Sequence, residues 1–235
     1  MFDIFLKEDE LFQLFGVQHL LVILLSIMAS ILIIFLVNKY LSEKNKTVLG
    51  GLLALFVAFL ILFRIGILIY TGEYTHQNEL PLHLCRLLPF FAVPMMFKRN
   101  RFLFGFLYFY IVVGTTNALA TPDLEFALPN YTAILYWLIH GILAFLPFYA
   151  IFVYKMKPRL KDLIRAILYI HIYLVLIHLI NIGLGSNYFY TIEKPPTATP
   201  LDLFGPWPWY ILVADILMWF LFALAYLPFM RFKKT

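Results

Sequence analysis

Long apolar segments separated by short charged stretches constrain this chain more than any other feature. Of its 235 residues, 63% are hydrophobic, and the mean hydropathy is +0.88, whereas soluble domains contain roughly 45–50% apolar residues. About 20 apolar residues allow one helix to cross a bilayer. The sequence therefore predicts an all-α membrane protein, a seven-transmembrane-helix bundle forming a single polytopic domain over 1–235. The predicted spans lie near 17–40, 49–70, 81–97, 102–120, 131–154, 163–184 and 207–230.

Basic residues are concentrated in alternate segments between the predicted spans. One set of segments holds fourteen of them: Lys39, Lys44, Lys46, Lys98, Arg99, Arg101, Lys155, Lys157, Arg159, Lys161, Arg165, Arg231, Lys233 and Lys234. The other set holds two, Lys7 and Lys194, against Asp3, Glu8, Asp9, Glu10, Glu73, Glu79, Asp123, Glu125, Glu193 and Asp202. Because lysine and arginine are enriched in cytoplasmic loops, we expect the N-terminus outside and the C-terminus in the cytoplasm. The net charge of +5 then reflects orientation, and we expect no nucleic-acid partner.

Two further features limit the possible chemistry. The first apolar segment lacks the basic start and small-residue cleavage site of a signal peptide, so we expect it to remain as the first span. Cys85 is the only cysteine, which excludes an internal disulfide. A zinc site is an alternative use of the histidines and this thiol. However, the sequence has no HxxxH or CxxC spacing, and we expect neither a metal nor a cofactor.

Polar side chains inside the predicted spans favour the outer half of the membrane. Such groups are costly in lipid, so they indicate a functional site by default. The stretch from Glu79 to Arg86 (ELPLHLCR) places His83, Cys85 and Arg86 at the mouth of the third span. The remaining members of the predicted substrate site are Arg64, Asn117, Asp123, His140, His178, Asn181, Asn187 and Asp215. Scattered structural residues would not favour one leaflet, so this convergence predicts an intramembrane site at the outer face.

Two of these charged residues have similar predicted depths. Arg64 lies about six residues inside its span, and Asp215 is at a comparable depth in the last span. We therefore expect the two to form a buried pair, although a histidine is an alternative partner for Asp215. For Arg64 the alternative to a buried partner is an exposed charge, because a long basic side chain can extend its charged end toward the membrane interface.

The role of Cys85 depends on a base. On its own the thiol could be only a small buried side chain. If the third helix begins near position 81, Cys85 lies in its second turn, and His83 shares a face with Arg86 rather than with Cys85. A base must then come from another helix. Depth favours His178, and His140 is the other choice.

Five motifs extend over most of the chain in order. They are LPLHLC (80–85), GTTNALATPD (114–123), HG (140–141), GSNY (185–188) and LDLFGPWPWY (201–210). From Phe12 to Tyr210 the chain thereby resembles the bacterial YwaF family of integral membrane proteins. That family is similar, more distantly, to an animal membrane acyltransferase that remodels ether phospholipids and to the androgen-induced hydrolases of lipid esters.

The resemblance implies a location and a chemistry. It implies a multi-pass protein of the cell membrane, in a bacterium the plasma membrane, with a nucleophile at Cys85 and a histidine at His140. It departs from the expected pattern at Arg86, where a small or acidic residue would be typical.

The combined hypothesis is an enzyme. It is an acyltransferase or transacylase, or a lipid ester hydrolase, that takes phospholipid or lysolipid from the outer leaflet. Arg64 and Arg86 would bind the phosphate. The alternatives are a transporter, for which paired repeats are typical but not found here, and a lipid or small-molecule binding protein that uses the same pocket without a nucleophile.

Overall fold

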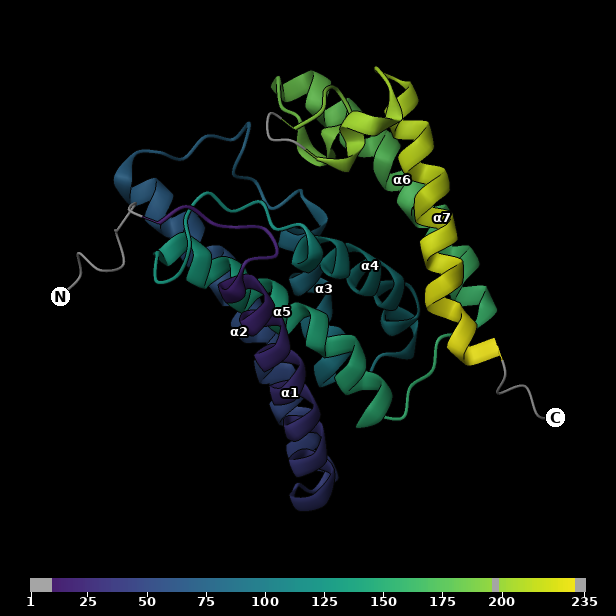
Figure 1. Ribbon diagram of the computed structural model, residues 1–235. Coiled ribbons are helices and arrows are strands. Elements are labelled where there is room, and N and C mark those ends of the chain that lie inside the picture. Colours follow the sequence, from purple (N-terminus) through teal and green to yellow (C-terminus); the bar gives the residue numbers. More distant parts are fainter. Residues whose placement is uncertain (1–9, 196–198, 231–235) are drawn as a thin grey trace.

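The computed structural model describes residues 10–195 and 199–230, and this part of the chain is helical. The α-helices are α1 (Val17–Tyr40), α2 (Glu43–Thr71), α3 (Leu84–Phe97), α4 (Arg101–Ala120), α5 (Tyr131–Phe152), α6 (Leu160–Leu184) and α7 (Trp209–Met230) (Figure 1). Two short 3₁₀ helices, η2 (Tyr188–Tyr190) and η3 (Pro200–Phe204), lie between α6 and α7. The predicted all-α class is confirmed. The terminal residues counted for orientation, Asp3, Lys7, Glu8, Asp9, Arg231, Lys233 and Lys234, lie outside the described residues.

Several helix boundaries follow from capping residues in the sequence. The Ser42 hydroxyl accepts a hydrogen bond from the backbone of Asn45 at 3.3 Å, so α2 begins at Glu43, earlier than hydropathy predicts. Asn100 caps α4 in the same way through its side-chain oxygen. At the other end of α2, Gly72 has φ +78°, a left-handed conformation that glycine adopts without strain.

The start of α3 differs from the prediction. The helix begins at Leu84, with His83 as its N-cap, and not at position 81. Tertiary hydrogen bonds explain the shift, because the Leu80 amide donates to the Tyr188 hydroxyl at 2.9 Å and the Tyr173 hydroxyl donates to the Leu82 carbonyl. These partners satisfy the backbone of the preceding turn outside a helix. Cys85 consequently lies in the first turn of α3 and not in the second.

The helices pack around α3 and α4. Helix α2 packs against α3 and α5, while α6 and α7 pack against α4 and against each other. Figure 1 shows α1, α2 and α5 on one side of this centre and α6 with α7 on the other. Helix α1 contacts α5 and leaves most of its apolar side chains exposed. The largest fully buried side chains include Phe104, Phe109, Tyr149, Phe222 and Met95.

Six helices are long and apolar enough to cross a membrane, namely α1, α2, α4, α5, α6 and α7. Helix α3 is shorter, because its 14 residues extend about 21 Å at 1.5 Å per residue, against a hydrocarbon thickness of about 30 Å. The exposed apolar surface of the long helices is what lipid contact requires. The protein is therefore a multi-pass membrane protein.

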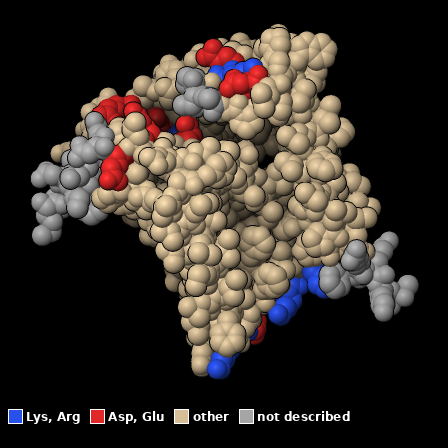
Figure 2. All heavy atoms as spheres, viewed as in Figure 1, with Lys and Arg blue, Asp and Glu red and all other residues tan. Residues whose placement is uncertain are grey.

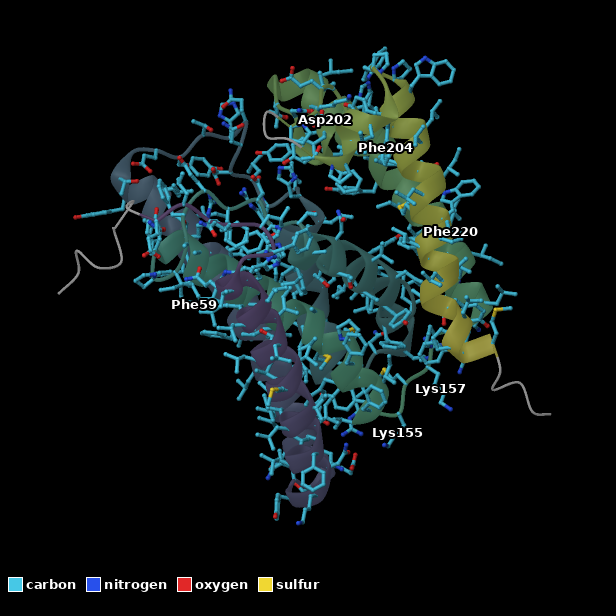
Figure 3. The ribbon with its side chains drawn as sticks, in the orientation of Figure 1. Phe59, Lys155, Lys157, Asp202, Phe204 and Phe220 are labelled. Carbon is cyan, nitrogen blue, oxygen red and sulfur yellow. The ribbon has the colours of Figure 1, made fainter. Side chains whose placement is uncertain are left out.

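Charged residues separate toward the two ends of the bundle. Figure 2 shows lysine and arginine at the lower end of the view and most acidic residues at the upper end. Lys155 and Lys157 lie at the basic end, far from Asp202 at the acidic end (Figure 3). This distribution agrees with the alternation of charge read from the sequence.

An ion pair fastens two helices at the basic end. Arg101 of α4 donates to the Asp162 carboxylate of α6 at 2.6 Å, and only 4% of the Asp162 side chain is exposed. Gly105 makes this approach possible, because a Cβ there would lie 2.7 Å from Asp162 Oδ1. A second pair, Arg99 with Glu43 at 2.9 Å, joins the end of α3 to the start of α2.

Candidate functional site

A cluster of three charged residues lies where α2 and α3 meet at the acidic end. Glu79 accepts hydrogen bonds from Nη1 and Nη2 of Arg64 in α2. It also accepts one at 3.1 Å from Nη1 of Arg86 in α3. Arg86 also donates to the Asn78 carbonyl at 3.0 Å. Only 15% of the Glu79 side chain is exposed. Two arginines on one carboxylate give this Arg64–Glu79–Arg86 cluster a net charge of +1.

The expected pair between Arg64 and Asp215 is wrong. Arg64 binds Glu79, while Asp215 of α7 accepts a hydrogen bond at 3.0 Å from the His171 ring of α6. Helix α2 packs against α3 and α5, whereas α7 packs against η3, α4 and α6. A similar predicted depth therefore did not make these two residues partners, and the alternative partner, a histidine, is the observed one for Asp215.

Cys85 is half-buried, and two tyrosines lie near it. The hydroxyls of Tyr136 in α5 and Tyr190 in η2 lie within electrostatic range of its thiol. Its neighbour Arg86 acts electrostatically on both the thiol and the Tyr190 hydroxyl. Sequence reasoning did not assign these tyrosines to the site, since one uncharged aromatic residue gives no signal of its own in a sequence that is 19% aromatic. Tyr188, which ends the motif GSNY, was the nearest indication.

His140 stacks on Tyr136. Their ring centroids are 4.1 Å apart with an interplanar angle of 28°. His140 Nδ1 lies 2.9 Å from the Tyr136 carbonyl, which can only accept, so Nδ1 carries the proton and Nε2 of the neutral ring has a free lone pair. Tyr136 therefore lies close to both His140 and Cys85. No hydrogen bond joins Cys85 to His140 within the described part of the chain.

The short helix η2 (Tyr188–Tyr190) lies against His83 at the start of α3. The His83 ring contacts Tyr188 and Tyr190 with centroid distances of 5.4 and 5.5 Å, and the Phe189 amide approaches His83 Nδ1 at 3.5 Å. Phe189 and Tyr190 have φ values of +58° and +54°, in the left-handed region that bulky side chains rarely adopt. Tertiary contacts must hold this backbone in place.

Asn181 supplies those contacts. Its amide nitrogen donates at 2.8 Å to the Tyr188 carbonyl and to the Thr191 hydroxyl, and its oxygen accepts at 2.8 Å from Ser186 and from the Tyr188 amide. The side chain is 1% exposed. His178 lies beside it, 3.3 Å from the Thr191 hydroxyl. Asn181 thus forms four hydrogen bonds that shape the segment over the site.

The other predicted substrate residues occupy separate positions. Asn187 binds the backbone of Ile192 and Glu193 and so also shapes the segment after α6. Asp123 lies within electrostatic range of the hydroxyls of Tyr136 and Tyr190. Asn117 is exposed in the last turn of α4. Of these three, Asp123 is the one brought next to the tyrosines around Cys85.

Packing is open near several of these residues. A Cβ added to half-buried Gly114 would meet no atom within 4 Å, and at Gly141 the nearest atom would be 4.0 Å away. At the basic end the corresponding space at Gly51 and Gly105 is filled. The space-filling view also shows a hollow between α6 with α7 and the rest of the surface (Figure 2). Within the described residues, no three histidine, cysteine or acidic side chains are placed to hold a metal ion.

Comparisons with known proteins identify a family. No curated protein and no solved structure matches the chain. The sequence profile of the TMEM164 family, a family of membrane proteins, matches residues 14–226. The finer resemblance to YwaF proteins and their animal relatives stays a prediction. Since the match extends over nearly all of the 235 residues, this chain belongs to the TMEM164 family.

Proposed function

We propose that this protein is an intramembrane acyltransferase, transacylase or ester hydrolase acting on phospholipid or lysolipid of the outer leaflet. Cys85 is the nucleophile and His140 the base. One observation carries the proposal: the thiol, the stacked Tyr136–His140 pair and the Arg64–Glu79–Arg86 cluster converge from α2, α3 and α5 at the acidic end. A reacting lipid ester needs such a combination of nucleophile, base and cation.

The proposal includes a topology of seven spans in one domain, with the N-terminus outside and the C-terminus in the cytoplasm. The Arg99–Glu43 pair supports it, because it joins the end of α3 to the start of α2 at the basic end. The Arg64–Glu79–Arg86 cluster joins the opposite ends of the same two helices. Helix α3 therefore runs antiparallel to the part of α2 that lies between Glu43 and Arg64.

Reporter fusions test this topology. A reporter that is active only in the cytoplasm is expected to function after Arg99 or Lys161 and to fail after Thr75 or Glu125. The reason is that segments rich in lysine and arginine are retained in the cytoplasm. A cytoplasmic signal from the Glu125 fusion would contradict the proposed orientation.

The first chemical step is formation of the thiolate. An unperturbed cysteine has a pKa of about 8.5 and needs a cation, a base or a helix N-terminus to ionise at neutral pH. Cys85 lies in the first turn of α3, where the helix dipole acts most strongly, and Arg86 follows it directly. The lone pair at His140 Nε2 accepts the thiol proton once the substrate closes the distance, as catalytic hydrogen bonds often tighten only in the complex.

The thiolate then attacks the ester carbonyl carbon. The tetrahedral oxyanion is stabilised by backbone N–H groups of the first turn of α3 and by the Tyr190 hydroxyl. Collapse transfers the acyl chain to Cys85, and the alcohol leaves with the proton from His140. A lysolipid hydroxyl or water, deprotonated by His140, then attacks the thioester and restores the thiol.

The Arg64–Glu79–Arg86 cluster binds the lipid phosphate. Each guanidinium offers five donors, and the contacts with Glu79 and Asn78 engage only some of them. The net charge of +1 favours an anion at this depth. The open packing near Gly114 and Gly141 gives the acyl chains room beside the site.

Mass spectrometry tests the proposal. Purified protein is incubated with phospholipids carrying a labelled acyl chain and with lysolipids, and the intact protein and the lipids are then weighed. We expect a labelled acyl mass on Cys85 and label in the lysolipid acceptor, or free labelled fatty acid in the case of hydrolysis.

One observation favours a second function. Because no hydrogen bond joins Cys85 to His140 in the described residues, the same pocket could serve a lipid-binding protein or transporter without covalent chemistry. Bound lipid that is recovered unchanged, with no acyl mass on the protein, would support that function instead.

A further inference from the structure

A second polar pair lies between α6 and α7 and takes no part in the proposed chemistry. His171 Nδ1 is 2.6 Å from the carbonyl of Ile167, one turn earlier in α6, and His171 Nε2 is 3.0 Å from Asp215 Oδ2 in α7. The side chains of His171 and Asp215 are 39% and 17% exposed. Both residues lie well inside apolar helices, where an ionisable pair is costly and indicates a role.

The hydrogen bonds of His171 require two protons. The Ile167 carbonyl can only accept, so His171 Nδ1 must donate to it. The contact between Nε2 and Asp215 Oδ2 needs another proton, carried either by the ring or by the carboxyl group. In both cases the pair holds one proton more than a neutral histidine beside a carboxylate, and its net charge is zero.

Loss of that proton removes the link. A lone pair on Nε2 would then face a carboxylate, and Asp215 would carry a negative charge in an apolar surrounding. Its other oxygen, Oδ1, is already buried without a hydrogen-bond partner among the described residues, so little else there can compensate the charge. The Trp219 ring, whose edge contacts His171 with a centroid distance of 5.6 Å, offers no acceptor for this purpose.

The groups on neighbouring elements do not replace this proton. Asp215 is the charged side chain that acts on His171. Tyr108 and Tyr110 of α4 donate their hydroxyls to backbone carbonyls of α7 and α6 at 2.9 and 2.7 Å. In η3, Asp202 lies 3.9 Å from the Lys194 ammonium.

We propose that His171 and Asp215 form a proton-binding site within the membrane domain, and that the bound proton fastens α7 to α6. The ligand is a proton, and the site is separate from Cys85. The stabilisation is present while the proton is bound and is lost as the pH rises through the titration of the pair. Within the described residues α7 packs mainly against η3, α4 and α6, and this link and the Tyr108 hydroxyl are polar contacts that attach it to α6 and α4.

Thermal unfolding of the full chain in detergent tests the proposal. It is measured from about pH 5 to about pH 9, a range that includes the ordinary histidine pKa. For the unchanged protein we expect Tm to fall toward high pH by about 2–4 °C, the shift for one interhelical hydrogen bond in a protein of this size. In Asp215→Asn the amide can donate to the neutral ring without taking up a proton. This variant should keep its Tm and lose the pH dependence.

Asp202→Asn is the matched control and should keep the pH response of the unchanged protein. Histidine-selective ¹⁵N NMR provides a second measurement that does not depend on unfolding. It should show one ring, assigned by its loss in His171→Gln, whose titration moves in Asp215→Asn and not in Asp202→Asn. Equal pH responses of Tm in all three proteins, or an unmoved His171 titration, would overturn the proposal.

Discussion

Acyl transfer is expected to be lost when Cys85 is replaced by alanine, because no other thiol in the chain can form the acyl intermediate. His140→Ala should lower the rate by roughly 100- to 10,000-fold, the usual contribution of a positioned general base. Both variants should fold, since Cys85 is only half-buried and the His140 ring hydrogen bond is made to a carbonyl of its own helix. The measurement is transfer of a labelled acyl chain from phospholipid to lysolipid by the purified proteins.

His76→Ala provides the control for this pair of variants, because His76 is an exposed histidine before α3 and its hydrogen bond to Tyr188 uses only the backbone. It should retain full activity. A comparable loss in His178→Ala, with His140→Ala still active, would make His178 the base. Full activity of Cys85→Ala would contradict the nucleophile assignment and favour the binding function.

Glu79→Gln is expected to cause the largest loss of stability. The change leaves Arg64 and Arg86 facing each other without a carboxylate, and hydrogen bonds to charged groups contribute roughly 1.5–3 kcal/mol each. Since both arginines are partly exposed, we expect a total loss of about 3 kcal/mol, or a fall in Tm of about 6–12 °C for a protein of this length. Thermal unfolding in detergent measures it.

Glu73→Gln makes the same chemical change at an exposed position in the same connection between α2 and α3. Its Tm should stay within about 2 °C of the unchanged protein, as surface substitutions usually do. If Glu79→Gln were equally mild, the cluster would not hold α2 and α3 together, and phosphate binding would need other residues.

Helix positions could be predicted because their causes are local. The span predicted for α1 coincides with the observed helix, and those of α4 and α7 differ by one or two residues at one end. Hydropathy over about 20 residues, capping side chains such as Asn100, and the alternation of charge are all properties of neighbouring residues.

Pairing between helices depended on the tertiary structure. Membrane depth can be counted along the sequence, but the partner of a side chain also depends on which helices are neighbours and how each is rotated. Arg64 and Asp215 have similar predicted depths, yet α2 packs against α3 and α5 while α7 packs against α4 and α6. Their partners are therefore Glu79 and His171.

The sequence by itself determined that this is an all-helical, multi-pass membrane protein, because long apolar runs favour membrane-spanning helices whichever way those helices pack. Only the tertiary structure decided the surroundings of Cys85. Hydrogen bonds from Tyr173 to the Leu82 carbonyl and from the Leu80 amide to Tyr188 delay the start of α3 to Leu84 and so bring the thiol into its first turn. The four hydrogen bonds of Asn181 hold the segment that contains Tyr188 and Tyr190 near the thiol. The Tyr173 and Tyr188 hydrogen bonds join residues 91 and 108 positions apart, and the Asn181 hydrogen bonds join residues five to ten positions apart; neither hydropathy nor charge alternation encodes them.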